Sequence, residues 1–260
     1  MQNAIICLVS FFVFMIMQKT ILQLRNSDFF TSYGMIVMNI IKIKNLLKRC
    51  SAFVLGLFIM AIGVALSVKA QLGVSPISCT PYVLSLKYSL TLGELTIIFN
   101  ALLMLIQILI LRKKYKLAQL IQLPMVIIFG YFIDLAMHMF SGFNTSSYLW
   151  QALYCILSCV IMAFGIFIIV QTDITYLLGD GLTVVIANIL KKDFGKVKIG
   201  FDSTMVSIGM ISSFFLLHSI QGIREGTLIS ALSVGYLVKF YSDRLPMVNM
   251  WLAKNPDNQK

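Results

Sequence analysis

IMAIG at residues 59–63 returns as IMAFG at residues 161–165, and this repeated stretch of apolar sequence decides the fold. Three further glycine landmarks recur around it, each second copy lying within 102 to 107 residues of the first: Leu72-Gly73 as Leu178-Gly179, Leu92-Gly93 as Ile199-Gly200, and Gly130-Tyr131 as Gly235-Tyr236. The nearly constant spacing predicts one membrane module present twice, an internal two-fold repeat typical of transporters.

Composition places the 260-residue chain among membrane proteins. Hydrophobic residues make up 59% of it, charged residues only 12%, and the mean hydropathy is +0.90, whereas a soluble domain carries about 25% charged residues. The net charge of +11 does not predict a nucleic-acid partner, because the basic residues form short clusters between apolar runs. Such clusters mark the cytoplasmic loops of a polytopic all-α membrane protein.

Each repeat is expected to hold three full spans and one short or broken helix. A full span needs about 20 apolar residues to cross a hydrocarbon core of ~30 Å. In the first repeat (38–147) the expected full spans are 50–68, 95–111 and 117–140, and the short segment is 73–86. In the second repeat (148–245) they are 148–170, 203–220 and 227–241, with the short segment at 176–190.

The basic residues choose between two topologies. Sixteen of the 21 lie in four clusters, at 42–49, 112–116, 191–198 and 239–260. If the short segments re-enter the side from which they came, all four clusters are cytoplasmic, the second repeat is inverted, and residues 246–260 form a cytoplasmic tail. If they cross, the cluster at 112–116 lies outside, against the positive-inside rule. Inverted repeats of three spans are therefore favoured, and parallel repeats of four spans are the alternative.

Residues 1–37 fit neither repeat. Their apolar run, residues 4–17, is too short to span a bilayer, and no basic region precedes it as in a signal peptide. We expect an N-terminal extension, and translation could equally begin at Met38, whose basic sequence leads into the first span.

Five motifs resemble those of the YczE/YyaS/YitT group of bacterial membrane proteins, over residues 38–245. They are LGVSPIS (72–78), SLTLGELTIIFN (89–100), GYFID (130–134), KVKIGFD (196–202) and REGTLISALSVGY (224–236). The resemblance implies a multi-pass protein of the bacterial plasma membrane, and it implies no defined activity. The second repeat departs from the pattern by having LGDGL where the first has LGVSP.

The short segments hold the candidate binding residues. Irregular backbone at membrane depth is tolerated where protein or a water-filled cavity satisfies it, and the start of a half-helix suits a polar or anionic group. The candidates are therefore Gly73, Ser75, Pro76, Gly179, Asp180 and Gly181, with Arg224 and Glu225 before the last span. The alternatives are that the small residues pack helices, that Asp180 caps a helix, and that Arg224 and Glu225 lie in a solvated loop.

Other polar residues have simpler interpretations. Asp134 and His138, one helical turn apart, are expected to form an interfacial pair, and Glu94 and Asp202 to open helices, where acids are favoured. The uncharged polar residues within the spans more often bridge helices than bind substrate; these are Asn100, Gln107, Gln122 and Asn188. The five cysteines lack metal-site spacing and are expected to be packing residues.

These features favour a transporter or exporter of a small solute, with its site between the two short helices. A neutral or zwitterionic solute, a small anion or a lipid-like molecule would suit an interior with few charges. The alternative is an accessory or scaffold protein of a secretion or biosynthetic complex. The chain has no recognisable catalytic motif, so we expect no enzyme, cofactor or metal. Expected partners are membrane lipid and an unknown solute, with a homo-oligomer left open.

Overall fold

The computed structural model describes residues 32–112, 115, 117–142, 147–192 and 194–245. The described chain is helical, which confirms the expected all-α class; the predicted extension up to residue 31 and the predicted tail 246–260 lie outside it. The helices are α2 (Ser32–Ala70), α3 (Pro76–Lys87), α4 (Leu92–Leu111), α5 (Gln122–Met139), α6 (Tyr148–Gln171), α7 (Leu178–Leu190), α8 (Phe194–Leu217) and α9 (Glu225–Arg244), with a short 3-10 helix, η2 (Leu117–Ile121), before α5.

Five stretches of the described chain are long and apolar enough to cross a membrane, and this confirms a multi-pass protein. They are Lys44–Ala70, Leu92–Leu111, Gln119–Met139, Tyr148–Gln171 and Gly195–Leu217. The sixth predicted span, 227–241, lies in α9. That helix has the length of a span, 20 residues. Its charged, serine and glycine residues make it less hydrophobic than the other five, and it does not count among the apolar stretches.

The two predicted short segments are helices shorter than a full span. α3 has 12 residues and α7 has 13, which correspond to only about 18–20 Å at 1.5 Å per residue. Each follows a residue in extended conformation, Ser75 before α3 and Leu177 before α7. Pro76 occupies the first turn of α3, where a missing backbone donor costs nothing.

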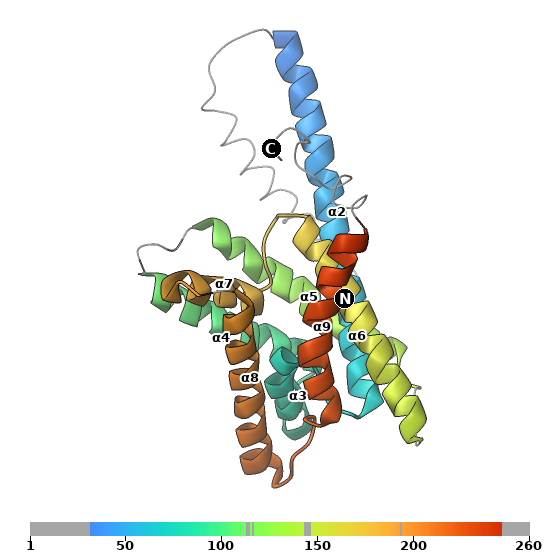
Figure 1. Ribbon diagram of the computed structural model, residues 1–260. Helices are drawn as coiled ribbons and strands as arrows, with labels where there is room; N and C mark the ends of the chain where they lie inside the picture. Colours follow the sequence, from blue (N-terminus) through green and yellow to red (C-terminus); the bar gives the residue numbers. More distant parts are fainter. Residues whose placement is uncertain (1–31, 113–114, 116, 143–146, 193, 246–260) are drawn as a thin grey trace.

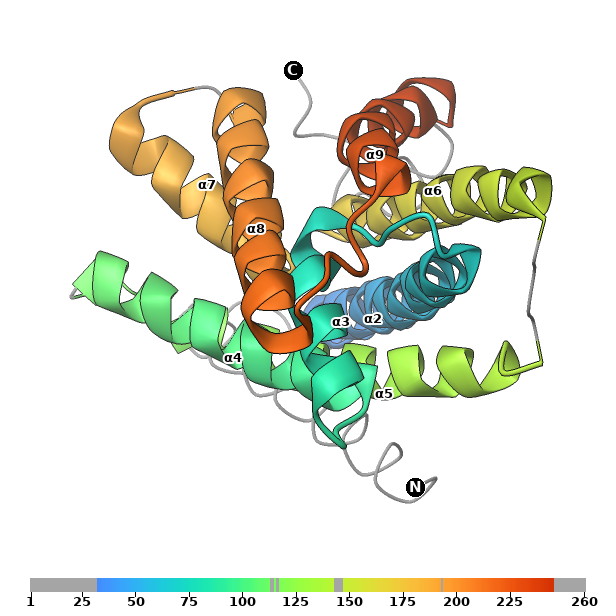
Figure 2. The ribbon, with the colours of Figure 1, turned by 90° about the horizontal axis from the view of Figure 1, so that it is seen from below.

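An antiparallel pair, α2 and α6, forms the centre of the molecule and is its most extensive helix contact. Helix α5 packs on α2, and α9 packs on α6; beside them α3 contacts α8, and α4 contacts α7. In Figure 1, α2 and α8 descend while α6 and α9 ascend. Figure 2, from below, shows α4, α7 and α8 on one side of α2, and α6 and α9 on the other.

Glycines let α2 and α6 approach until their backbones touch. A Cβ atom added to Gly63 of α2 would lie 2.8 Å from the backbone nitrogen of Met162. One added to Gly165 of α6 would lie 2.6 Å from the backbone nitrogen of Met60. Both distances are too short for real atoms, so these positions of IMAIG and IMAFG require glycine, as at close helix crossings in membranes.

Helix α8 begins earlier than predicted, at Phe194 instead of residue 203. The hydropathy of its first residues is lowered by Lys196, Lys198 and Asp202, so a hydropathy reading starts the span after them. The structure places Lys198 and Asp202 inside a helix, one turn apart. Because α8 extends over these residues, Lys198 and Asp202 can pair with each other on one face of the helix.

Candidate functional site

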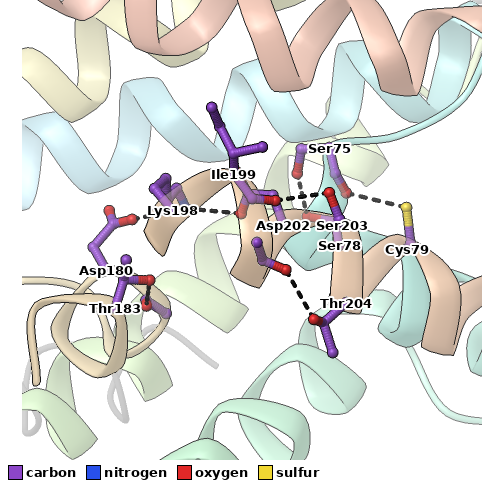
Figure 3. A network of polar contacts seen from close by, with 12 residues as sticks. Ser75, Ser78, Cys79, Asp180, Thr183, Lys198, Ile199, Asp202, Ser203 and Thr204 are labelled. Carbon is purple, nitrogen blue, oxygen red and sulfur yellow. Dashed lines mark hydrogen bonds and ion pairs between the residues drawn. The ribbon is translucent and has the colours of Figure 1, made fainter. Parts of the chain in front are cut away.

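Asp180, Lys198 and Asp202 form a charged cluster between α7 and α8, which we call the Asp–Lys–Asp cluster. The Lys198 Nζ atom lies 3.0 Å from Oδ1 of Asp180 and 3.0 Å from Oδ1 of Asp202. The three side chains are 29%, 30% and 14% exposed, respectively. Figure 3 shows Lys198 between the two carboxylates. An ammonium between two carboxylates offsets part of the cost of removing each of them from water.

Local geometry brings these three residues together. Asp202 follows Lys198 by four positions on α8, so both side chains share one face of that helix. Asp180 comes from the first turn of α7. The neighbouring Gly179 allows Ile77 of α3 to come so close that a Cβ atom would collide with it. The starts of both short helices therefore meet beside α8.

The structure corrects two interpretations of these charges. Asp180 does not cap α7, because Leu177 occupies the N-cap position and Asp180 lies within the helix. Asp202 does not open its helix, because α8 begins at Phe194. Lys198, grouped by sequence with a basic loop cluster, was missed as a site residue. The signal available was its spacing of four from Asp202 within KVKIGFD, a spacing that pairs charges on a helix.

A first cavity, of about 220 Å³, lies where the loop after α2 meets the loop before α9; we call it the loop cavity. Its lining residues are Ser67, Val68, Gln71, Gly73, Val74, Tyr82, Ile220, Gln221, Gly222 and Arg224. The loops are joined by backbone hydrogen bonds from Val74 to Gly222 (3.1 Å) and from Gly226 to Leu72 (2.8 Å). Two predicted site residues, Gly73 and Arg224, therefore line one cavity.

Gly73 needs to be glycine for two reasons. Its φ is +112°, which other residues rarely adopt, and an added Cβ atom would collide with Oγ1 of Thr227. The Arg224 guanidinium donates a 3.3 Å hydrogen bond to the Gln71 carbonyl. The motifs LGVSPIS and REGTLISALSVGY are thus contacting parts of one structure.

A second cavity, of about 570 Å³, lies among the C-terminal half of α4, η2, the start of α5 and α7; we call it the carboxamide cavity. Its lining residues are Gln107, Leu111, Gln119, Gln122, Tyr176, Gly181, Val184, Val185, Asn188 and Ile189. The predicted site residue Gly181 lies here. Gln107, Gln122 and Asn188 were expected to bridge helices, but they line a cavity, which sequence position could not show.

The predicted site between the short helices is divided in the structure. Ile77 of α3 fills the approach to α7 and packs with a cluster that includes Phe201 and Leu182. Ser75 donates a 2.8 Å hydrogen bond to Ser78, and Pro76 is buried at the start of α3. Figure 3 shows Ser75, Ser78 and Cys79 at the start of α3, the helix that packs against α8. Gly73 and Gly181 therefore face different cavities, and Ser75, Pro76 and Gly179 belong to the packed region between them.

Three further acidic residues singled out in the sequence, Glu225, Glu94 and Asp134, either lie at the surface or bind the start of a helix. Glu225 pairs with Arg224 at 3.3 Å, and both side chains are largely exposed, as a solvated loop would have them. Glu94 and Thr91 form a capping box that starts α4. Asp134 accepts hydrogen bonds from Thr91 Oγ1 (2.7 Å) and from the Gly93 backbone (2.8 Å). Asp134 therefore binds the start of α4 and not the expected partner His138, whose side chain is exposed.

The described residues offer little for a metal ion. No group of three or more His, Cys, Asp or Glu side chains among them could hold one. The four cysteines described are buried free thiols, namely Cys50, Cys79, Cys155 and Cys159. The chemistry that the site can provide is therefore charge pairing and hydrogen bonding.

Comparison with known proteins agrees with this membrane architecture. The family of unknown function DUF6198 matches residues 47–243. The uncharacterized protein YyaS of Bacillus subtilis is 28% identical over 203 residues, covering 77% of this chain and 94% of YyaS. The uncharacterized membrane protein YczE of the same organism is 26% identical over 200 residues, covering 76% of this chain and 86% of YczE. No solved structure matches the chain. The chain is therefore a multi-pass membrane protein that belongs to the DUF6198 family.

Proposed function

We propose that the protein is a small-solute transporter of the bacterial plasma membrane that works by alternating access between two inverted repeats. The observation that carries the proposal is a pair of cavities, each with polar side chains in its lining, that are separated by the packed meeting point of α3 and α7. The loop cavity is lined by residues at the end of α2, and the carboxamide cavity by residues at the end of α4. In Figure 1, α4 ends higher in the view than α2 does. Broken helices between repeats are where transporters place their sites.

Reciprocal contacts between α2 and α6 support an inverted relation of the halves. Gly63 meets Met162, and Gly165 meets Met60, where Met60 corresponds to Met162 and Gly63 to Gly165 in the repeated motif. Moving from Met60 to Gly63 along α2 moves the contact backwards from Gly165 to Met162 along α6, as in antiparallel helices. A contact in which i meets j and j meets i is the signature of a two-fold axis.

The other helix contacts exchange in the same way. If α2 corresponds to α6, α3 to α7, α4 to α8 and α5 to α9, the contact of α2 with α5 becomes that of α6 with α9. The contact of α3 with α8 becomes that of α7 with α4. The four basic clusters and the C-terminus then share the cytoplasmic side, in accord with the positive-inside rule.

One pair of contacts breaks this symmetry and supports alternation. Gly93 of α4 and Gly130 of α5 pack so closely that a Cβ atom on Gly93 would collide with the Gly130 carbonyl. Their counterparts, Gly200 of α8 and Gly235 of α9, have no atom within 4 Å of an added Cβ. In the opposite state of the transporter, α8 closes on α9 and α4 separates from α5. The halves exchange conformations, and access moves from one cavity to the other.

Thiol labelling from each side of the membrane tests the topology. In a background with all cysteines changed to serine, Gln119→Cys should react with a membrane-impermeant maleimide in inverted vesicles. Gln221→Cys, in the loop cavity, should react in intact cells. Parallel repeats would instead expose both positions to the outside, and that result would refute the inverted topology.

Uptake of labelled neutral and zwitterionic solutes into proteoliposomes tests the activity. We expect saturable transport, lowered by Asp180→Asn because that change removes one ion pair of the Asp–Lys–Asp cluster. The exposed Lys192→Met serves as the control. Absence of transport of every solute, combined with stable copurification of a partner protein, would favour the accessory or scaffold role.

A further inference from the structure

Three glutamine side chains from successive elements converge on the carboxamide cavity. Gln107 comes from α4, Gln119 from η2 and Gln122 from α5. Gln107 is 1% exposed and Gln122 is 4% exposed. The Oε1 atom of each glutamine is buried and accepts no hydrogen bond from the described residues. A buried polar oxygen without a partner is costly, so three of them at one cavity indicate a site built for a ligand that donates hydrogen bonds.

Gly181 keeps the space beside two of these side chains open. A Cβ atom added there would lie 2.9 Å from Nε2 of Gln122 and 3.8 Å from Oε1 of Gln107. Any larger residue on this turn of α7 would press on the carboxamide of Gln122. The glycine thus leaves two buried carboxamides within reach of a bound molecule.

Among the residues that the structure describes, the cavity lining carries no Asp, Glu, Lys, Arg or His side chain. Asp180 is next in sequence to Gly181, but its carboxylate is engaged by Lys198 at 3.0 Å. A charged solute that entered this cavity would lose its hydration and find no counter-charge in the lining, so its binding would be strongly unfavourable. The lining therefore selects for an uncharged molecule and against a zwitterion, a free anion or a metal cation.

The pattern of donors and acceptors narrows the class further. A carboxamide offers both an acceptor oxygen and N–H donors, and a hydroxyl group can satisfy either because it donates and accepts. Aliphatic residues of the lining, Leu111, Val184, Val185 and Ile189, suit the C–H faces of such a molecule. The volume of about 570 Å³ is in the range of small-molecule sites. We propose that the carboxamide cavity binds a neutral polyhydroxylated solute, such as a polyol or a sugar, as the substrate of the transporter proposed above.

Thermal unfolding of the purified full-length protein tests this proposal. The buried cysteines allow unfolding to be followed with a thiol-reactive fluorophore. Glycerol, ribitol and glucose are titrated separately, with alanine, glycine betaine and potassium chloride as charged comparisons. We expect at least one of the polyhydroxylated probes to raise Tm saturably. Gln107→Met and Gln122→Met, which keep side-chain volume, should each weaken that binding by about tenfold, as loss of hydrogen bonds to a buried polar side chain predicts.

Asn100→Leu is the matched control, because Asn100 is a buried carboxamide of the same helix outside the cavity lining. It should leave the saturable effect unchanged. Polyols also stabilise proteins by exclusion from their surface, and an equal rise of Tm in wild type and Gln107→Met would overturn the proposal. A saturable effect produced only by alanine, betaine or potassium, or by none of the probes, would also overturn it. The sidedness labelling of Gln119→Cys and Gln221→Cys tests the inverted topology, and uptake into proteoliposomes tests transport, each separately from binding at this cavity.

Discussion

At the scale of single residues, Lys198 matters because its ammonium pairs with two acids that the fold brings together. Its Nζ atom is 3.0 Å from a carboxylate on α7 and 3.0 Å from one on its own helix. Two carboxylates at one site repel each other unless a cation lies between them. The consequence of changing any member therefore depends on which of the others remain.

We expect Lys198→Met to lower Tm and yield more than Asp180→Asn does, because it leaves two acids without their cation. Adding Asp180→Asn to Lys198→Met should then raise Tm, although the same change lowers Tm in the wild type. This reversal of sign is a coupling between contacting groups. Thermal unfolding in detergent measures it, with Lys192→Met as the exposed control. Additive effects in the double variant would show that the three charges are not coupled.

Asp134 provides a second test at this scale. Because it accepts hydrogen bonds from Thr91 and Gly93 at the start of α4, Asp134→Ala should destabilise the protein by roughly 1–2 kcal/mol, as loss of a helix cap does. His138→Gln should leave Tm nearly unchanged because His138 is exposed. Equal effects of the two changes would instead favour the Asp134–His138 pair expected from their spacing.

At the scale of helices, glycines decide which pairs touch. Gly63 and Gly165 place the backbones of α2 and α6 in contact, and Gly93 and Gly130 do the same for α4 and α5. In the proposed repeat, Gly200 and Gly235 correspond to the second pair, but open space lies beside them. The same residue type at corresponding positions therefore holds one helix pair closed while the other is separated.

We expect Gly165→Leu to abolish accumulation of folded protein, because its Cβ would lie 2.6 Å from the Met60 backbone and backbone cannot move aside cheaply. Gly200→Leu should give normal abundance, because nothing lies within 4 Å of its added Cβ. If α8 must close on α9, Gly200→Leu should nevertheless transport slowly. Abundance and uptake together separate these effects, and normal uptake by Gly200→Leu would contradict the closure.

At the scale of the whole molecule, α4 and α5 are in close contact while α8 and α9 are separated at Gly200 and Gly235. An alternating-access cycle would exchange these two arrangements. We expect oxidation to join the cysteines of Gly200→Cys/Gly235→Cys, in the cysteine-free background, when α8 reaches α9. A disulfide needs Cα atoms about 4.4–6.8 Å apart. Mass spectrometry of linked peptides detects the product, and the transported solute should change its yield. Gly200→Cys paired with Gly142→Cys is the control, and equal linkage in both variants would indicate random collision.

Several features of this fold follow from the order of residues along the chain. Apolar runs predicted the helices, and their lengths separated six expected spans, five of which the structure confirms, from the short α3 and α7. The predicted start of α8 was wrong because Lys198 and Asp202 lower the local hydropathy, whereas in the helix they form a partly buried ion pair. Gln107 and Gln122 were interpreted as helix bridges, since sequence shows that a span is polar at a position but not what that position faces.

The sequence by itself determined the all-helical membrane class and showed glycines that recur at a nearly constant spacing. Hydropathy and helix length depend on residues that are close together along the chain, so the sequence contains them. Repeated glycines can likewise be recognised without coordinates. Only the tertiary structure decided that Lys198 lies between Asp180 and Asp202, that three glutamines share a cavity, and that Gly93 is packed while Gly200 is open. These relations join residues on different helices, and distances between helices are set by packing in three dimensions.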